Sequence, residues 1–121
     1  MLDKIRLHEK GGLPEDYQPN LGKGFDETCV QFLGVDYSAV ADRVKQGLGD
    51  EEILTWCFNS GTARQPNEIH IWNEYMRKRG WNDEIASTLQ RRKREAGMEE
   101  RNEIETMFQF IDADEDRPIQ Q

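Results

Sequence analysis

Hydrophobic residues along this chain recur at helical spacing, and the most regular stretch is residues 66–81, PNEIHIWNEYMRKRGW. At about 100° per residue, the apolar side chains of this stretch fall on one arc. They are Ile69, Ile71, Trp72, Tyr75 and Met76. Pro66 suits the first turn of a helix, and Gly80 can adopt the left-handed conformation that ends one. The pattern therefore predicts an amphipathic helix between Pro66 and Gly80, with a broad aromatic face.

Shorter helices are predicted on both sides of this one, and most of them end at a glycine. They cover residues 2–10, 25–33, 37–46, 50–60, 83–96 and 101–111. The stretch 13–24 holds two prolines and two glycines, so we expect a loop there, with Tyr17 and Leu21 as its anchors.

The fold class predicted from these elements is all-α. No alternating run of apolar and polar residues indicates a strand, and 121 residues are enough to build one core without disulfides or metals. We expect a compact single domain of about six short helices over residues 1–112, packed around Trp56, Trp72 and Phe108. Residues 113–121 are predicted to form an acidic, flexible tail.

The composition of the chain limits which partners and which cellular location we expect. Aromatic residues make up 9% of the chain and argue against disorder, although charged residues reach 33%. A net charge of −8 repels nucleic acid and anionic membranes on average. No apolar run is long enough to span a bilayer, and the first ten residues are too charged for a secretory signal. We therefore expect a soluble, cytoplasmic protein.

Positive charge is concentrated between Arg77 and Arg94, where seven basic side chains stand against two acidic ones. The predicted interaction surface in this region consists of Arg77, Lys78, Arg79, Trp81, Arg91 and Arg92. An acidic protein, or the acidic tail of this chain or of a second copy, suits this surface better than RNA. Trp81 is the only aromatic residue in it, and proteins that bind single strands need several stacking rings.

Three short stretches, MLDKIR, LGKGFD with FLGVDY, and IWNEYMRKRGW, together resemble a bacterial family known as a domain of unknown function, DUF5069. The resemblance extends from Leu2 to about Ala113, and the order and spacing of the stretches make it specific. It implies no established activity, and so it assigns no catalytic role to any residue of this chain.

A candidate anion site is formed by Lys4, Arg6 and Lys23, with Trp72 as an aromatic wall. Lysine supplies a point charge, and the glycines on both sides of Lys23 can expose backbone N–H groups to a phosphate or carboxylate. The alternative is that the three cations are separate surface charges whose convergence depends on the fold.

Other residue types capable of chemistry lack the partners that a catalytic or metal site requires. His70 has no second base or nucleophile in sequence, and Cys29 and Cys57 are predicted to be buried free thiols. The acidic run 112–116 suggests a calcium loop, but Arg117 stands where that loop needs glycine. We therefore predict no catalytic residue, no metal and no cofactor.

The function expected from the sequence is that of a small cytoplasmic binding domain, which acts by protein–protein contact or by self-association. The alternative is an anionic-ligand binder or enzyme whose site lies among the N-terminal helix, the loop 13–24 and the aromatic helix. The sequence leaves open whether the chain has any catalytic activity.

Overall fold

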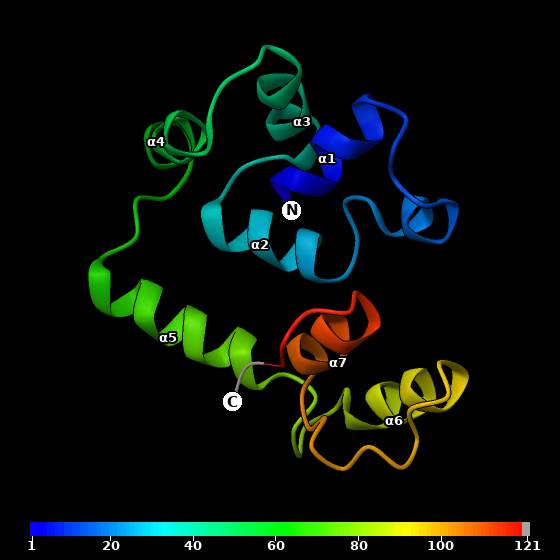
Figure 1. The fold of residues 1–121 in the computed structure, drawn as a ribbon. Helices are drawn as coiled ribbons and strands as arrows, with labels where there is room; N and C mark the ends of the chain where they lie inside the picture. The colour runs from blue at the N-terminus through cyan, green and yellow to red at the C-terminus, as the bar shows by residue number, and fades with distance from the viewer. Residues whose placement is uncertain (120–121) are drawn as a thin grey trace. The chain divides into compact units, whose positions relative to one another are not determined.

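The structure, a computed structural model, describes residues 1–119 apart from the side chain of Asp16. Within these residues it contains seven α-helices, one 3₁₀-helix and no strand, which confirms the all-α prediction (Figure 1). The elements are α1 (Leu2–Glu9), η1 (Glu15–Asn20), α2 (Phe25–Leu33), α3 (Tyr37–Lys45), α4 (Asp50–Ser60), α5 (Pro66–Lys78), α6 (Ala86–Glu95) and α7 (Met107–Asp114). In the described part of the chain, none of these helices combines the length and the apolar character needed to cross a membrane.

The chain divides into two compact units, which we call unit 1 (Met1–Arg64) and unit 2 (Gln65–Gln121). Unit 1 contains α1 to α4, and unit 2 contains α5 to α7. Folding of residues 1–112 as one domain stays a prediction. Helix α7 extends two residues into the predicted tail, and residues 120–121 of that tail lie outside the described residues.

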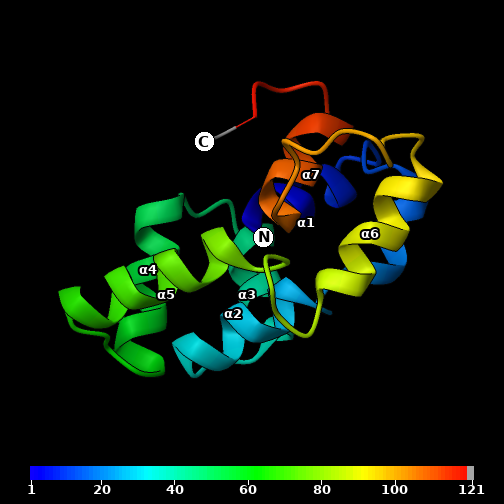
Figure 2. The same cartoon turned by 90° about the horizontal axis from the view of Figure 1, so that it is seen from below.

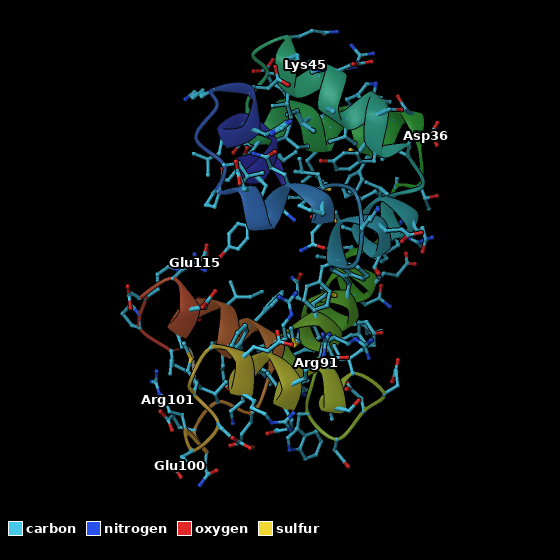
Figure 3. The ribbon with its side chains drawn as sticks, turned by 90° about the vertical axis from the view of Figure 1, so that its right-hand side faces the viewer. Asp36, Lys45, Arg91, Glu100, Arg101 and Glu115 are labelled. Atoms are coloured by element: carbon cyan, nitrogen blue, oxygen red, sulfur yellow. The ribbon has the colours of Figure 1, made fainter. Side chains whose placement is uncertain are left out.

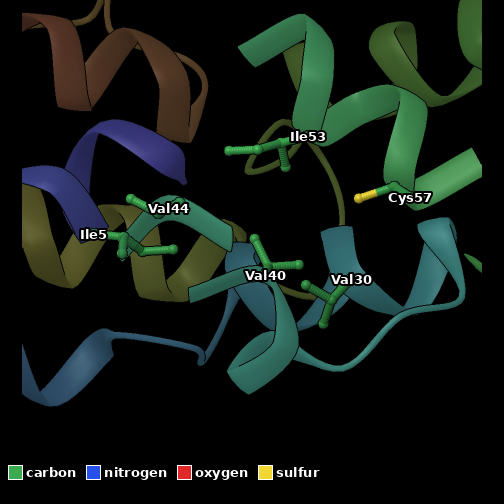
Figure 4. Close-up of a cluster of buried hydrophobic side chains, with 6 residues drawn as sticks. All are labelled: Ile5, Val30, Val40, Val44, Ile53 and Cys57. Carbon is green, nitrogen blue, oxygen red and sulfur yellow. The ribbon is translucent and has the colours of Figure 1, made fainter. Parts of the chain in front are cut away.

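Unit 1 is built around α3, which packs against α1, α2 and α4. Val40 and Val44 lie four residues apart and therefore on one face of α3, where both are buried. Six side chains from the four helices form the cluster shown in Figure 4: Ile5, Val30, Val40, Val44, Ile53 and Cys57. Burial of each aliphatic member stabilises the unit by about 1.5–3 kcal/mol.

The predicted loop 13–24 is more ordered than a plain connector. It forms η1, and Leu13 beside this helix is 5% exposed, whereas the expected anchors Tyr17 and Leu21 are half-buried. The Gln18 side chain donates a hydrogen bond to the Leu13 carbonyl at 3.2 Å. Leu13 is therefore a buried residue of this loop, and the Gly22 N–H joins the loop to Asp26 of α2.

In unit 2, α7 packs against both α5 and α6, whose arrangement can be followed in Figure 2. The buried side chains of this unit are mostly aliphatic or sulfur-containing: Met76, Leu89, Ile104, Met107, Phe110 and Ala113. The Met107 N–H donates to the Arg79 carbonyl at 2.8 Å and so joins the end of α5 to the start of α7. Gly80 allows this approach, because its φ is +99° and an added Cβ would lie 3.0 Å from the Met107 nitrogen.

The last helix begins later than predicted, at Met107 instead of residue 101. Thr106 and Gln109 form a capping box there, in which the Gln109 N–H donates to Thr106 Oγ1 at 3.2 Å and the Thr106 N–H donates to Gln109 Oε1 at 3.2 Å. Ile104, which the sequence placed on the helix, lies before this cap and is nevertheless 1% exposed.

The predicted central residues Trp56, Trp72 and Phe108 are half-buried instead of fully buried. Trp56 packs against the core cluster of unit 1, and tryptophan is so large that it is seldom fully enclosed. The Arg43 guanidinium lies 5.0 Å from the centre of the Trp56 ring, so this indole packs against a cation. Phe110 is the buried aromatic residue of unit 2.

Candidate functional site

Lys4, on α1, forms an ion pair inside unit 1. Its Nζ lies 2.7 Å from Oδ2 of Asp26, the second residue of α2, and this aspartate is only 3% exposed. The same carboxylate oxygen accepts a hydrogen bond from the Gly22 N–H at 3.2 Å. A buried carboxylate without a counter-charge is strongly unfavourable, so the Lys4 charge stabilises unit 1.

Arg6, two residues further along α1, contacts a different set of oxygens. Its guanidinium lies 2.6 Å from Asp50 at the start of α4 and 3.3 Å from Asp3, and it donates to the Leu48 carbonyl at 3.4 Å. The hydrogen bond to Asp50 is the main cause that raises the pKa of Arg6. Arg6 therefore ties α1 to the start of α4.

The third predicted anion ligand, Lys23, lies in the exposed turn between η1 and α2, where its backbone carbonyl accepts from the Asp26 N–H at 3.2 Å. Lys4 and Arg6 thus pair with separate carboxylates, and an anion shared by the three cations stays a prediction. Trp72, the aromatic member of that predicted site, belongs to unit 2.

The predicted basic surface of unit 2 is largely offset by neighbouring carboxylates. Glu74 accepts from Arg77 at 2.8 Å and lies 3.2 Å from Lys78 Nζ, one turn along α5. The hydrogen bonds from Arg77 and then Lys78 lower the pKa of Glu74 to about 2. Side chains three or four residues apart on a helix are neighbours, so opposite charges at this spacing pair within the helix.

The same pairing extends beyond α5. Arg79 binds Asp83 at 3.1 Å and Glu84 at 3.0 Å. Arg91, labelled on α6 in Figure 3, lies 3.5 Å from Glu95, while Arg92 is exposed. The positive field of this surface is therefore weaker than its composition indicates.

An exposed apolar strip on α5 is a feature that sequence reasoning missed. Ile71 is 64% exposed and Tyr75 is 47% exposed, although both were assigned to one arc with Met76, which is buried. The arc of apolar residues is too wide to pack entirely against one neighbouring element, and only the side of the helix that carries Met76 is buried in the core. With Glu68 and Lys78, these residues follow the spacing i, i+3, i+7, i+10 along one helix face. We call the four residues Glu68, Ile71, Tyr75 and Lys78 the α5 strip.

The Tyr75 ring in this strip is held by its neighbours. Its centre lies 6.4 Å from that of Trp72 with an interplanar angle of 37°, and the Arg79 guanidinium lies 5.2 Å from the Tyr75 ring centre. An exposed ring fixed between an indole and a cation loses little conformational entropy when it is covered by a partner.

Unit 2 also contains a hollow of about 230 Å³ between α6, the turn that follows α5 and the segment that leads to α7. We call it the Lys93 hollow. Its polar and aromatic lining consists of Trp81, Asn82, Gln90, Lys93, Asn102 and Glu105. Lys93 is 2% exposed, and its Nζ donates to the Ile104 carbonyl at 3.1 Å. A signal for this burial is present in the sequence, because Lys93 follows Ile85 and Leu89 at four-residue steps and so belongs to their apolar face.

A second hollow, of about 330 Å³, lies in unit 1 and is lined mainly by apolar residues and by both cysteines. Cys29 and Cys57 are free thiols, and burial raises the pKa of each. A raised thiol pKa reduces the thiolate fraction at neutral pH and with it the nucleophilicity. Elsewhere, His70 is exposed on α5. Among residues 1–119, no three His, Cys, Asp or Glu side chains are placed to share a metal ion.

Comparisons with known proteins agree with the resemblance seen in the sequence. Searches of curated proteins and of solved structures give no match to this chain. The family described as a domain of unknown function, DUF5069, matches residues 1–117, which include both units up to the end of α7. The chain therefore belongs to the DUF5069 family.

Proposed function

We propose that this chain is a protein-binding module, and that the occupant of the α5 strip is a second copy of the same chain. The observation that carries the proposal is the order of side chains along the strip, in which Ile71 and Tyr75 are flanked by an acidic Glu68 at one end and a basic Lys78 at the other. Exposed apolar residues rimmed by charge are typical of interaction surfaces.

The strip is complementary to itself in an antiparallel arrangement. A two-fold axis next to Asn73 places Ile71 opposite Tyr75 of the second copy and Glu68 opposite its Lys78, because each pair is equidistant from residue 73. The apolar contact and the charge contact then each occur twice. A parallel arrangement would instead set like charges against each other, so the order of charges favours the antiparallel one.

The association is expected to be weak and reversible. Two apolar side chains from each copy form a small interface, and interfaces of that class have dissociation constants of about 1 µM or above. We place it in the cytoplasm, where the two free thiols Cys29 and Cys57 stay reduced. The alternative function, capture of an anion by Lys4, Arg6 and Lys23, ranks lower because Lys4 and Arg6 already pair with Asp26 and Asp50.

Sedimentation velocity over a range of protein concentrations tests the proposal. The wild-type chain should shift toward dimer as concentration rises, and Ile71→Glu should stay monomeric. Leu7→Glu is the matched control, because Leu7 is also an exposed aliphatic residue, at 46%, but lies in unit 1 on α1. It should dimerise like the wild type.

Reversing the charges at the two ends of the α5 strip tests the orientation of the two copies in the same experiment. Lys78→Glu places two acidic residues opposite each other and should weaken the dimer, and the added change Glu68→Lys should restore it. A wild-type chain that stays monomeric at the highest concentration would exclude a second copy as the occupant. A dimer that Ile71→Glu leaves intact would exclude the α5 strip as the surface.

A further inference from the structure

Lys93 is a buried cation that no carboxylate contacts directly. Its side chain is 2% exposed, and in the described part of the chain it forms no ion pair, while Nζ donates a hydrogen bond to the Ile104 carbonyl at 3.1 Å. Its charge acts on Glu103, whose pKa it helps to lower after the larger effect of Arg101. An ammonium group carries three N–H donors, so one carbonyl leaves two donors for other acceptors. Removal of a lysine charge from water is unfavourable unless an opposite charge is supplied.

The Lys93 hollow provides room for a ligand that supplies this charge. Its volume of about 230 Å³ is below the range of about 300–1,000 Å³ that is usual for drug-sized ligands, so it has room only for a smaller molecule. One wall is the indole of Trp81, which is 56% exposed, and amide groups of Asn82, Gln90 and Asn102 offer both donors and acceptors. Such a lining binds a polar molecule with one flat or apolar side.

A second charge of opposite sign lines the same hollow. Glu105 is exposed there, and its carboxylate suits an ammonium group or another hydrogen-bond donor, while Lys93 suits a carboxylate. A ligand with both groups has no net charge and is not repelled by the −8 of the protein, whereas a phosphate dianion is repelled. The pair of lining charges therefore favours a zwitterion over a simple anion.

The turn at the edge of the hollow is defined by its backbone. Asn82 has a φ of +50°, in the left-handed region that asparagine adopts more readily than most residues other than glycine. The turn that carries Asn82 also carries Trp81 and thus presents the aromatic wall.

We propose that the Lys93 hollow binds a small amino carboxylate of about the size of a free amino acid. The ligand carboxylate contacts Lys93, its ammonium group contacts Glu105, and its side chain packs on the Trp81 ring. This site shares no residue with the α5 strip, so it does not depend on self-association.

Two-dimensional ¹H–¹⁵N NMR of the full chain tests the proposal through the indole N–H of Trp81, assigned with Trp81→Phe. The probes are the twenty common L-amino acids, each titrated as the free acid and as its α-carboxamide. At least one free acid should give a saturable shift of the indole signal. Its carboxamide should bind at least about tenfold more weakly, because it lacks the charge that faces Lys93.

Variants identify the protein groups. Lys93→Met retains the aliphatic stem without the charge and should weaken binding at least about tenfold, and Glu105→Gln should weaken it for probes that carry the ammonium group. Arg92→Met is the matched control, since Arg92 is the neighbouring cation on α6 and does not line the hollow. It should bind as the wild type does, and so should Ile71→Glu.

The proposal is overturned if no free amino acid shifts the Trp81 indole saturably up to 10 mM, a limit of about −2.7 kcal/mol in binding free energy. It is also overturned if the carboxamide binds as tightly as the free acid, or if folded Lys93→Met binds like the wild type. The comparison of acid with amide uses the wild-type chain and decides the question even if Lys93→Met does not fold.

Discussion

In the described part of the chain, each unit buries one charged side chain, and the two have different partners. In unit 1, Asp26 is 3% exposed and has a direct counter-charge from Lys4 at 2.7 Å, together with the Gly22 N–H. In unit 2, Lys93 is 2% exposed, donates to a neutral carbonyl at 3.1 Å and acts on Glu103 without forming an ion pair with it. The first charge is paired directly within its unit, while the second leaves room for a carboxylate from outside. This difference separates a charge that stabilises the fold from one available for binding.

The space around the glycine that follows a helix also differs between α4 in unit 1 and α6 in unit 2. In unit 1, a Cβ added to Gly61 would collide with the carbonyl oxygen of Leu33 and lie 2.7 Å from that of Gly34. Gly97 in unit 2 follows α6 in open surroundings, with no atom within 4 Å of an added Cβ. Gly61→Ala should therefore destabilise the protein by about 3 kcal/mol through overpacking against backbone. Gly97→Ala should cost about 1 kcal/mol, because only its φ of +74° is strained.

Urea denaturation monitored by circular dichroism measures both changes. A Gly61→Ala protein as stable as the wild type would show that the ends of α2 and α4 separate readily, and the contrast between the Gly61 and Gly97 sites would then fail.

Removal of the counter-charge of Asp26 in unit 1 is expected to cause the next largest loss in the free energy of unfolding. Lys4→Met leaves Asp26 buried with only the Gly22 N–H, and should lower the free energy of unfolding by about 2 kcal/mol, less than for a fully buried pair because the Lys4 side chain is 32% exposed. Lys45→Met is the control. Its Nζ lies 3.9 Å from Glu9, and both side chains are exposed, so the loss should stay below about 1 kcal/mol. Equal losses in the two variants would contradict the role given to Asp26.

The same substitution in unit 2 should have a smaller effect. Lys93→Met removes a buried charge that forms no direct ion pair in the described part of the chain, and this gain offsets the lost hydrogen bond to the Ile104 carbonyl. We expect the free energy of unfolding to be unchanged or raised by up to about 1 kcal/mol, measured in the same denaturation experiment. A loss of more than about 2 kcal/mol would mean that Lys93 serves as a structural clamp, and the two buried charges would then be alike.

The smallest expected effect concerns an exposed ion pair. The pKa of Glu74 is lowered to about 2 in the folded chain, from a reference of 4.5, so its contribution is complete above about pH 4.5 and is lost as pH falls through about 2. NMR titration of the Glu74 carboxyl carbon should give that low midpoint. Arg77→Gln should raise it, and so should 0.5 M salt, because exposed pairs are screened. A midpoint near 4.5 in the wild-type chain would mean that the pair is not formed in solution.

Local signals in the sequence were sufficient for most helices. Helix α2 begins and ends at the predicted residues, because its acidic first turn and Gly34 act within a few residues of the helix ends. The start of α7 was predicted six residues too early, because Ile104 continues the apolar spacing of the helix. The Thr106 and Gln109 capping box was the local signal that had been overlooked.

The candidate sites were harder to predict from the sequence, because they depend on residues that only the packing of the helices brings together. Ion pairs such as Lys4 with Asp26 join different helices and have no local signature. Pairing of Arg77 and Lys78 with Glu74 was readable from their spacing, but a net count of charges hides it. Lys93 was counted among the seven basic residues between Arg77 and Arg94, although its place in the Ile85 and Leu89 series indicated burial.

Both cysteines of the chain lie in unit 1, and unit 2 contains none. Cys57 is 1% exposed within the core cluster, so a thiol reagent reaches it only when that core opens. The rate at which a thiol reagent modifies Cys57 therefore measures how often the core of unit 1 opens. In a Cys29→Ser chain, Cys57 is the remaining thiol, so its modification rate can be followed alone. Comparing that rate with the Lys93 hollow empty and filled would show whether a ligand in unit 2 changes the opening of unit 1.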